Sequence, residues 1–374
     1  MDLRARTLLS GFALATSWTW CIGMFAPFVL YGMFGWPGIL AFAIPNILGC
    51  ALFGFFRSRE RSITETRDHA MAMSVFSAAT VGYQIFFAGS KMGPIIEEES
   101  RFGSGSAKAI AAGSVFAAAV LLALVPRRAL WLIAGLGFLA SLTTFAFIPW
   151  GELNALQSTG YWTHAQLWLV LPTIVFGFAL SPNLDLTFHR ARQESPNPAF
   201  PANFIVFGLA FASMLALTTC YLASPQGLTI PAVRAHIVLQ LVLTCALHLS
   251  ELRTASIAPT ARALLGVGSG LVGVTAVILA DHQDTYLRFL GLYGLLFPAY
   301  AVLALRTVGR PTPAGLLALA LSVAIATPII SKSFLDGPSL TAPLAVVLPI
   351  AAVLLVSRKP GAPSAADTPK NPGF

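Results

Sequence analysis

The chain has 374 residues, of which 56% are hydrophobic and 10% are charged, and its formal net charge is +8. Soluble domains carry about 25% charged residues and have too little interior to bury this much apolar surface, so a water-soluble fold is excluded and lipid is the expected solvent. The four cysteines all lie inside apolar runs without metal-ligand spacing, which favours packing over disulfides or metal binding.

Twelve apolar runs follow one another, each close to the roughly 20 residues of helix that cross a hydrocarbon layer about 30 Å thick. Runs of this length predict helices rather than barrel strands. An all-α polytopic membrane protein with about 12 transmembrane helices is therefore expected in 1–358. The runs lie at 9–32, 36–56, 70–90, 106–125, 129–148, 166–187, 203–223, 231–250, 262–280, 286–305, 313–330 and 340–357.

Lys and Arg are unevenly shared between the loops. With the N-terminus inside, 17 of the 23 lie on the inner side. Basic loops remain in the cytoplasm, so both termini are expected there and the chain is expected in the plasma (inner) membrane. The basic balance is thereby a topology signal, and nucleic acid is not an expected partner. The segment 359–374, rich in Pro, Ala and small polar residues, is predicted to be a disordered cytoplasmic tail.

Two spans contain residues that interrupt helices: SWTWCIGMFAP (17–27) in the first and SPNLD (181–185) in the sixth. Proline opens the helical ladder, and irregular backbone at membrane depth survives only against protein or a water-filled cavity. One interrupted helix opens each block of five spans, and the two enter from opposite sides, as in inverted repeats with a binding site at the midplane. Two ordinary kinked helices are the alternative.

The stretch GFALSPNLDLTFHRA (177–191) resembles the sixth core helix of sodium/solute symporters, which has a glycine–aromatic pair, a proline and an arginine at the positions of Gly177, Phe178, Pro182 and Arg190. VGYQIFFAGSKMG (81–93) is similar to the third-helix stretch of such transporters. Ten spans plus two fit the wider amino acid-polyamine-cation superfamily. The resemblance implies a LeuT-type 5+5 inverted repeat, with repeats at about 9–148 and 166–305 and two extra C-terminal helices in 313–357.

Asp185 is the leading candidate for ion coupling, because a carboxylate inside a span costs about 2.5–3.5 kcal/mol and so has a purpose or a partner. The alternative is an interfacial salt bridge with Arg190 or Arg192. Asn183 either binds solute or caps the half-helix after the break. Asn46, which follows Pro45, is expected to break the second span and to pair across to Asn183 or Asp185.

The eighth span places His236, Gln240, Thr244 and His248 at four-residue steps, and therefore on one helix face. In the LeuT-type fold this helix offers hydroxyls to a sodium site shared with the first helix, and Thr244 is the nearest counterpart. One hydroxyl stands where a pair is usual, which leaves proton coupling through His248 or His236 open. The alternatives are a polar seam between helices and histidines near the two interfaces.

Four further residues are candidates for binding solute. Trp18 and Trp20 could stack on a ring-bearing solute or simply pack, Gly23 lies at the first break, and Gln84 could line the solute path or bond a neighbouring helix.

These features favour a secondary transporter, an ion-coupled symporter or permease that moves a small polar solute by alternating access, and not an enzyme. The sequence has no nucleotide-binding motif, so a sodium or proton gradient is the expected energy source, without other cofactors. One alternative is a membrane sensor that binds solute without moving it. Another is an intramembrane transferase with His248, His236 or Asp185 as a base.

Overall fold

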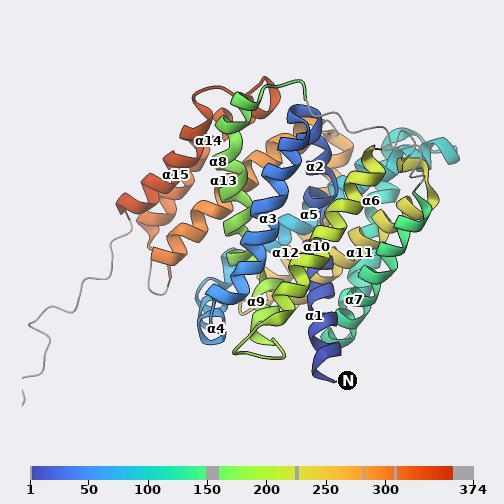
Figure 1. Ribbon diagram of the computed structural model, residues 1–374, viewed down its shortest axis with the longest axis horizontal. Helices are drawn as coiled ribbons and strands as arrows, with labels where there is room; N and C mark the ends of the chain where they lie inside the picture. The colour runs from blue at the N-terminus through green and yellow to red at the C-terminus, as the bar shows by residue number, and fades with distance from the viewer. Residues whose placement is uncertain (1, 149–159, 224–226, 281–282, 307–309, 357–374) are drawn as a thin grey trace, which may run out of the picture.

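The computed structural model describes residues 2–148, 160–223, 227–280, 283–306 and 310–356, and within these ranges the chain is all-helical, as predicted (Figure 1). The expected disordered tail lies outside the described residues. The helices are α1 (Leu3–Trp18), α2 (Cys21–Phe34), α3 (Trp36–Phe56), α4 (Arg59–Asp68), α5 (Ala70–Glu99), α6 (Ser104–Ala123), α7 (Arg127–Leu142), α8 (His164–Leu180), α9 (Leu186–Gln193), α10 (Ala202–Ala223), α11 (Pro231–Thr254), α12 (Pro259–Leu279), α13 (Gln283–Arg306), α14 (Pro313–Leu335) and α15 (Ala342–Val356), with short 3-10 turns η1 (Thr143–Phe147), η3 (Ser181–Leu184) and η4 (Gly227–Thr229).

Among the described residues, ten helices are long and apolar enough to cross a membrane, or eleven spans if the bent pair of α1 and α2 counts as one. The helix α15 has only 15 residues, so the expected twelfth span is not reached within the described part of the chain. Large apolar side chains lie on the outside of the helices, among them Leu209, Leu264 and Leu271. Monomeric soluble proteins rarely expose such extended apolar surfaces, so this arrangement supports a protein embedded in a membrane.

The long helices run up and down between two faces (Figure 1). One face carries the start of α1 together with α4 and α9, and is called the N-terminal face below. The junction of α2 with α3 and the connection between α14 and α15 lie at the opposite face. The helix α8 starts at that opposite face, so its continuation α9 reaches the N-terminal face, where it packs against α4.

The first predicted interruption is present. A bend of 61° separates α1 from α2, and the two residues between them, Thr19 and Trp20, have non-helical backbone angles. Pro27, which we expected to contribute to the break, lies inside α2 and does not end it. A membrane helix tolerates the one lost donor when neighbouring groups re-satisfy the freed carbonyl.

The second predicted interruption is also present. The 3-10 turn η3 separates α8 from α9, and Pro182 stands in its first turn, where a missing N–H has no helical partner to lose. Asp185 then adopts an extended conformation and caps α9 by accepting a hydrogen bond from the Thr187 backbone N–H at 2.7 Å. A proline that ends one segment and an aspartate that starts the next together produce this break.

The expected break in the second span is wrong. The helix α3 runs without interruption, with Pro45 in its interior. Asn46 does not pair with Asn183 or Asp185, because its side-chain oxygen accepts a hydrogen bond from Trp18 Nε1 at 2.7 Å. The side chain that could have capped a new helix after the proline is therefore engaged with α1.

Candidate functional site

The two breaks meet inside the molecule. Ser17 Oγ, at the end of α1, lies 3.0 Å from Thr187 Oγ1, in the first turn of α9, and both side chains are fully buried. Beside this hydrogen bond, the ring of Trp18 packs edge-on against Phe188 with 4.9 Å between the ring centroids. The ends of two interrupted helices, 170 residues apart in the sequence, are thus joined by one polar and one aromatic contact.

Asp185 is completely buried beside this junction. Its Oδ1 accepts hydrogen bonds from the backbone N–H and from the hydroxyl of Thr187, both at 2.7 Å. Its Oδ2 has no hydrogen bond, and His248 Nε2 lies 3.9 Å from it. The alternative of a salt bridge to nearby arginines is not observed, because Arg190 pairs with Glu251 and Arg192 donates to the Arg57 carbonyl.

The predicted polar face of α11 is buried along its whole length, at His236, Gln240, Thr244 and His248. Thr244 Oγ1 donates to the carbonyl oxygens of Thr16 at 2.7 Å, in the last turn of α1, and of Thr19 at 3.3 Å, in the break itself. His248 Nδ1 lies 3.3 Å from Ser77 Oγ of α5. The structure therefore brings three predicted ion-coupling residues, Asp185, Thr244 and His248, to the same pair of breaks.

The other two polar residues of this face lie farther along α11. Gln240 Nε2 donates to Ser141 Oγ at 2.7 Å. His236 packs against the ring of Tyr221, with both ring nitrogens lacking a hydrogen bond. Both histidines of α11 are buried.

The predicted solute-binding aromatics are buried at the first break. Trp18 is held by its hydrogen bond to Asn46. Trp20 packs edge-on against Tyr293 of α13, with 4.9 Å between the ring centroids, and lies near Phe76 of α5. Trp20 and its neighbours thus connect the break to two helices that the sequence did not link to it.

Of the remaining predicted solute-binding residues, Gln84 lies at the first break and Asn183 does not. Gln84 Oε1 accepts from the Cys21 backbone N–H at 2.5 Å, while its Nε2 has no partner. Gly23 lies in the first turn of α2, where an added Cβ would come within 3.4 Å of Phe211. Asn183 points to the N-terminal face, where its amide oxygen accepts a hydrogen bond from the Arg57 guanidinium.

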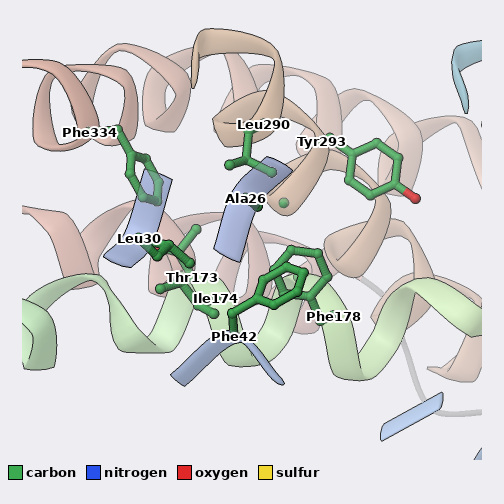
Figure 2. A pocket seen from close by; sticks show the side chains of 11 residues that line it. Ala26, Leu30, Phe42, Thr173, Ile174, Phe178, Leu290, Tyr293 and Phe334 are labelled. Carbon is green, nitrogen blue, oxygen red and sulfur yellow. The ribbon is translucent and has the colours of Figure 1, made fainter. Parts of the chain in front are cut away.

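A small pocket lies between the first break and the opposite face, at the junction of α2, α3, α8, α13 and α14 (Figure 2). Apolar side chains from these helices turn toward one another around it, and its cavity volume is about 20 Å³. Thr173 contributes a hydroxyl without a hydrogen bond, and Tyr293 links the pocket wall to Trp20. The other lining residues are Ala26, Leu30, Phe42, Ile174, Gly177, Phe178, Leu290, Gly294 and Phe334.

Ion pairs tie the helices together at the N-terminal face. Arg190 of α9 pairs with Glu251 of α11 at 3.0 Å, and Glu194 pairs with Arg127 of α7 at 2.6 Å. A third pair, at 3.0 Å, joins Arg57, at the end of α3, to a carboxylate of α4. We call these three pairs the N-terminal latch. Burial lowers the pKa of the Arg57 guanidinium from its ordinary value.

Beside the latch, neutral hydrogen bonds join α4 and α9. The Ser62 hydroxyl lies 2.9 Å from His189 Nδ1, and Gln193 Nε2 donates to Ser62 Oγ at 3.1 Å and to Thr66 Oγ1 at 3.2 Å. The polar helix α4 therefore holds the short half-helix α9 in place.

Glu251 is a residue that the sequence analysis missed. It is buried, and it stands three residues after His248, which places both on one face of α11. An acidic residue one turn beyond a candidate histidine, at the end of a span, is the signal that could have identified it. Tyr293 is the other omission, and its role as a bridge between pocket and break depends on tertiary contacts that the sequence does not encode locally.

Within the described ranges, no three His, Cys, Asp or Glu side chains lie close enough together to hold a metal ion. Oxygen atoms do converge at the first break, from the Thr16 and Thr19 carbonyls and the Thr244 hydroxyl, and the hydroxyl already donates to both carbonyls. No family model and no curated protein matches the chain.

Proposed function

We propose that this chain is a secondary transporter that moves a small polar solute across the plasma membrane by alternating access, driven by an ion gradient. The observation that carries the proposal is the meeting of two interrupted helices at Ser17 and Thr187, with Asp185, Thr244 and His248 around them. Broken membrane helices that meet at a buried polar centre are the usual construction of a solute site in secondary transporters.

The distribution of polar contacts along the membrane normal supports the same function. The three ion pairs of the latch close the N-terminal face. The pocket of Figure 2 lies on the other side of the breaks, with an apolar wall and only a few polar groups. In an alternating-access cycle one route to the site is closed while the other is open, and the latch supports closure of the route through the N-terminal face.

The finer architecture belongs to the same proposal. The segments from α1 to α7 form the first repeat and those from α8 to α13 the second, related by inversion, with α14 and α15 as extra helices. Each proposed repeat begins with an interrupted helix. The Lys and Arg bias places the N-terminal face in the cytoplasm, so the pocket lies on the outer side of the site.

The solute is held at the first break. Trp18, Trp20, Gly23 and Gln84 lie at or beside this break, and Gln84 Nε2 is a buried donor without a partner. A buried polar group without a hydrogen bond costs free energy unless a ligand or water satisfies it. Asn183 acts instead in the latch, through its bond to Arg57.

Thermal unfolding of the detergent-purified chain with a panel of small solutes tests the proposal. A ligand that binds only the folded state stabilises it by about 2.7 kcal/mol at one hundred times its dissociation constant. The solutes that stabilise the protein should then be taken up into liposomes that contain it. We expect Gln84→Leu to abolish solute stabilisation.

The matched control is Gln240→Leu, because Gln240 is an equally buried amide on α11 that bonds Ser141 away from the break. Equal loss of solute stabilisation in both variants would remove Gln84 from the site. Solutes that bind without being taken up into liposomes would contradict transport.

A further inference from the structure

The buried side chain of Asp185 has one saturated and one free carboxylate oxygen. Oδ1 accepts both hydrogen bonds from Thr187, while Oδ2 has none and faces His248 Nε2 across 3.9 Å. Both side chains are almost completely shielded from solvent. An acid and an imidazole in this arrangement exist either as a neutral pair or as an ion pair, and the two states differ only in the position of one proton.

The other titratable groups around Asp185 are less suited to accept a proton from its free oxygen. Cys50 of α3 and Tyr293 of α13 lie near enough to interact electrostatically with the carboxylate, and both are neutral at ordinary pH. His189 of α9 is occupied, since its ring nitrogens lie 2.9 Å from Ser62 Oγ and 3.0 Å from the Asn183 carbonyl oxygen. His248 is also bonded, to Ser77 Oγ through Nδ1 and to the Ser17 backbone, but its Nε2 is the imidazole nitrogen that lies 3.9 Å from the free oxygen, which makes it the nearest base for a proton on Oδ2.

A polar pocket lies at the N-terminal face, close in sequence to both members of this pair. It is lined by Arg190 and Glu251, by Leu186, which directly follows Asp185, and by Thr66, Gln193, Thr254, Ala255 and Ser256. Glu251 lies one helical turn from His248 on the same face of α11. The ion pair between partly exposed Arg190 and buried Glu251, flanked by Arg127 and Glu194, thus lies on the side of His248 that faces the N-terminal face.

We propose that the coupling ion is a proton, held by Asp185 and His248 and exchanged with water at the N-terminal face through the pocket beside Arg190 and Glu251. This inference rests on the transport function proposed above. In the step, the proton on Asp185 Oδ2 passes to Nε2 of His248: the O–H bond breaks, an N–H bond forms, and a carboxylate and an imidazolium result without electron transfer. The imidazolium then releases its proton to water in the pocket.

The same proton controls the contact between the two breaks. Thr187 donates to Asp185 and also contacts Ser17 of α1. A hydrogen bond to an ionised carboxylate is roughly twice as strong as one to a neutral acceptor. Deprotonation of Asp185 therefore fixes the first turn of α9, and protonation loosens it, which links proton binding to movement of the half-helix.

Infrared spectroscopy of the protein in liposomes of phosphatidylethanolamine and phosphatidylglycerol tests the proposal without knowledge of the solute. A protonated carboxylic acid has a C=O stretching band that an ionised one lacks. We expect a band that disappears as the pH is raised, that is missing in Asp185→Asn, and that is unchanged when sodium replaces choline. In His248→Gln the pH dependence of the band should differ from that of the wild-type protein.

The rate at which the infrared band changes measures proton access through the pocket. After a rapid pH jump the band should change at least about ten times faster in Glu251→Gln than in the wild-type protein, because the ion pair that separates His248 from water is lost. Asp284→Asn, which alters an acidic residue at the other end of the membrane, should leave this rate unchanged. Equal rates in Glu251→Gln and the wild-type protein would overturn the proposed route.

Three outcomes would overturn proton coupling: no band attributable to Asp185 at any pH between 4 and 9, a band independent of pH, or a band removed by sodium. Solute-dependent thermal stabilisation of the same samples separates this result from the transport proposal. Stabilisation by solute with no titrating Asp185 band rejects the proton and keeps transport. A titrating band with no stabilising solute and no uptake rejects transport alone.

Discussion

The hydroxyl of Thr244 should hold the broken end of α1 in place, and Thr244→Val isolates this contribution. Valine has nearly the same shape as threonine, so the change removes the donor without opening a large cavity. The Thr16 carbonyl keeps a backbone hydrogen bond from the Thr19 N–H at 3.2 Å, whereas the Thr19 carbonyl loses the bond that Thr244 gives it at 3.3 Å. The substitution therefore leaves one buried acceptor at the break, the Thr19 carbonyl, without the hydrogen bond from Thr244.

The size of the effect follows from the cost of such an acceptor. Leaving a buried acceptor unsatisfied costs about 1–3 kcal/mol in soluble proteins, and hydrogen bonds between membrane helices contribute about 0.6 kcal/mol on average and about 1.7 at most. We expect Thr244→Val to lower the free energy of unfolding by about 1–2 kcal/mol. This corresponds to a roughly fivefold to thirtyfold change in the unfolding equilibrium.

Denaturant titration of the purified protein measures this difference, with Thr327→Val as the matched control. Thr327 is half-buried in α14 and donates only to the Val323 carbonyl of its own helix at 2.7 Å. That carbonyl keeps its helical hydrogen bond, so the control should stay within about 0.5 kcal/mol of the wild-type protein. If Thr244→Val is no less stable than Thr327→Val, the hydroxyl does not hold the α1 break and the reasoning is refuted.

Two further predictions concern the N-terminal face. A double-mutant cycle with Arg190→Ala and Glu251→Gln should give a coupling energy of about 1–3 kcal/mol, because Glu251 is only 3% exposed. The same cycle on the exposed pair of Arg67 and Asp68 should give less than about 1 kcal/mol. Equal coupling energies for the two pairs would contradict a buried latch. Burial lowers the pKa of His69 below its ordinary 6.5, so the unfolded chain binds this proton more readily. The contribution of neutral His69 to stability is therefore complete above about pH 6.5 and is lost as the pH falls through the folded pKa. We expect His69→Gln to flatten the curve of unfolding free energy against pH in this range, as measured by denaturation. An unchanged curve would contradict the prediction.

The positions of the long helices could be predicted from the sequence because lipid imposes a simple requirement. Each crossing needs a continuous apolar run, and such runs are visible without knowledge of the partner helices. The run at 36–56 coincides with α3, and the run at 203–223 differs from α10 by one residue at its start. This requirement does not apply to the polar helix α4, and no apolar periodicity in the sequence predicts that helix.

The prolines show where local reasoning reaches its limit. Pro182 separates two helices while Pro27 and Pro45 lie inside continuous ones. After Pro182 the chain supplies a free capping side chain, Asp185, which starts a new helix. After Pro45 the corresponding side chain, Asn46, is engaged by Trp18 of α1. Whether a proline breaks a membrane helix therefore depends on long-range contacts that compete for the cap.

The sequence predicted which residues belong to the site better than it predicted which residues they contact. The four-residue steps of α11 place Thr244 and His248 on one face, and this follows from helical geometry alone. That this face meets the end of α1 and Asp185, rather than a solute path beside Asn183, is a result of packing. The proposed partners Arg190 and Arg192 were close in sequence, but both guanidinium groups bond elsewhere at the N-terminal face.

The contacts at the two breaks and at the N-terminal face differ in strength, and this difference bears on how the half-helices move. At the breaks, α9 is held to α1 by one neutral hydrogen bond and one aromatic contact, whereas at the N-terminal face it is held by a buried ion pair with Glu251 and by several polar contacts with α4. A neutral hydrogen bond contributes about 1 kcal/mol, while the ion pair is expected to contribute about 1–3 kcal/mol. In the proposed transport cycle, opening of the N-terminal face is therefore the more demanding movement, and we expect a change of charge near Glu251 to affect it more strongly than a change at the aromatic contact.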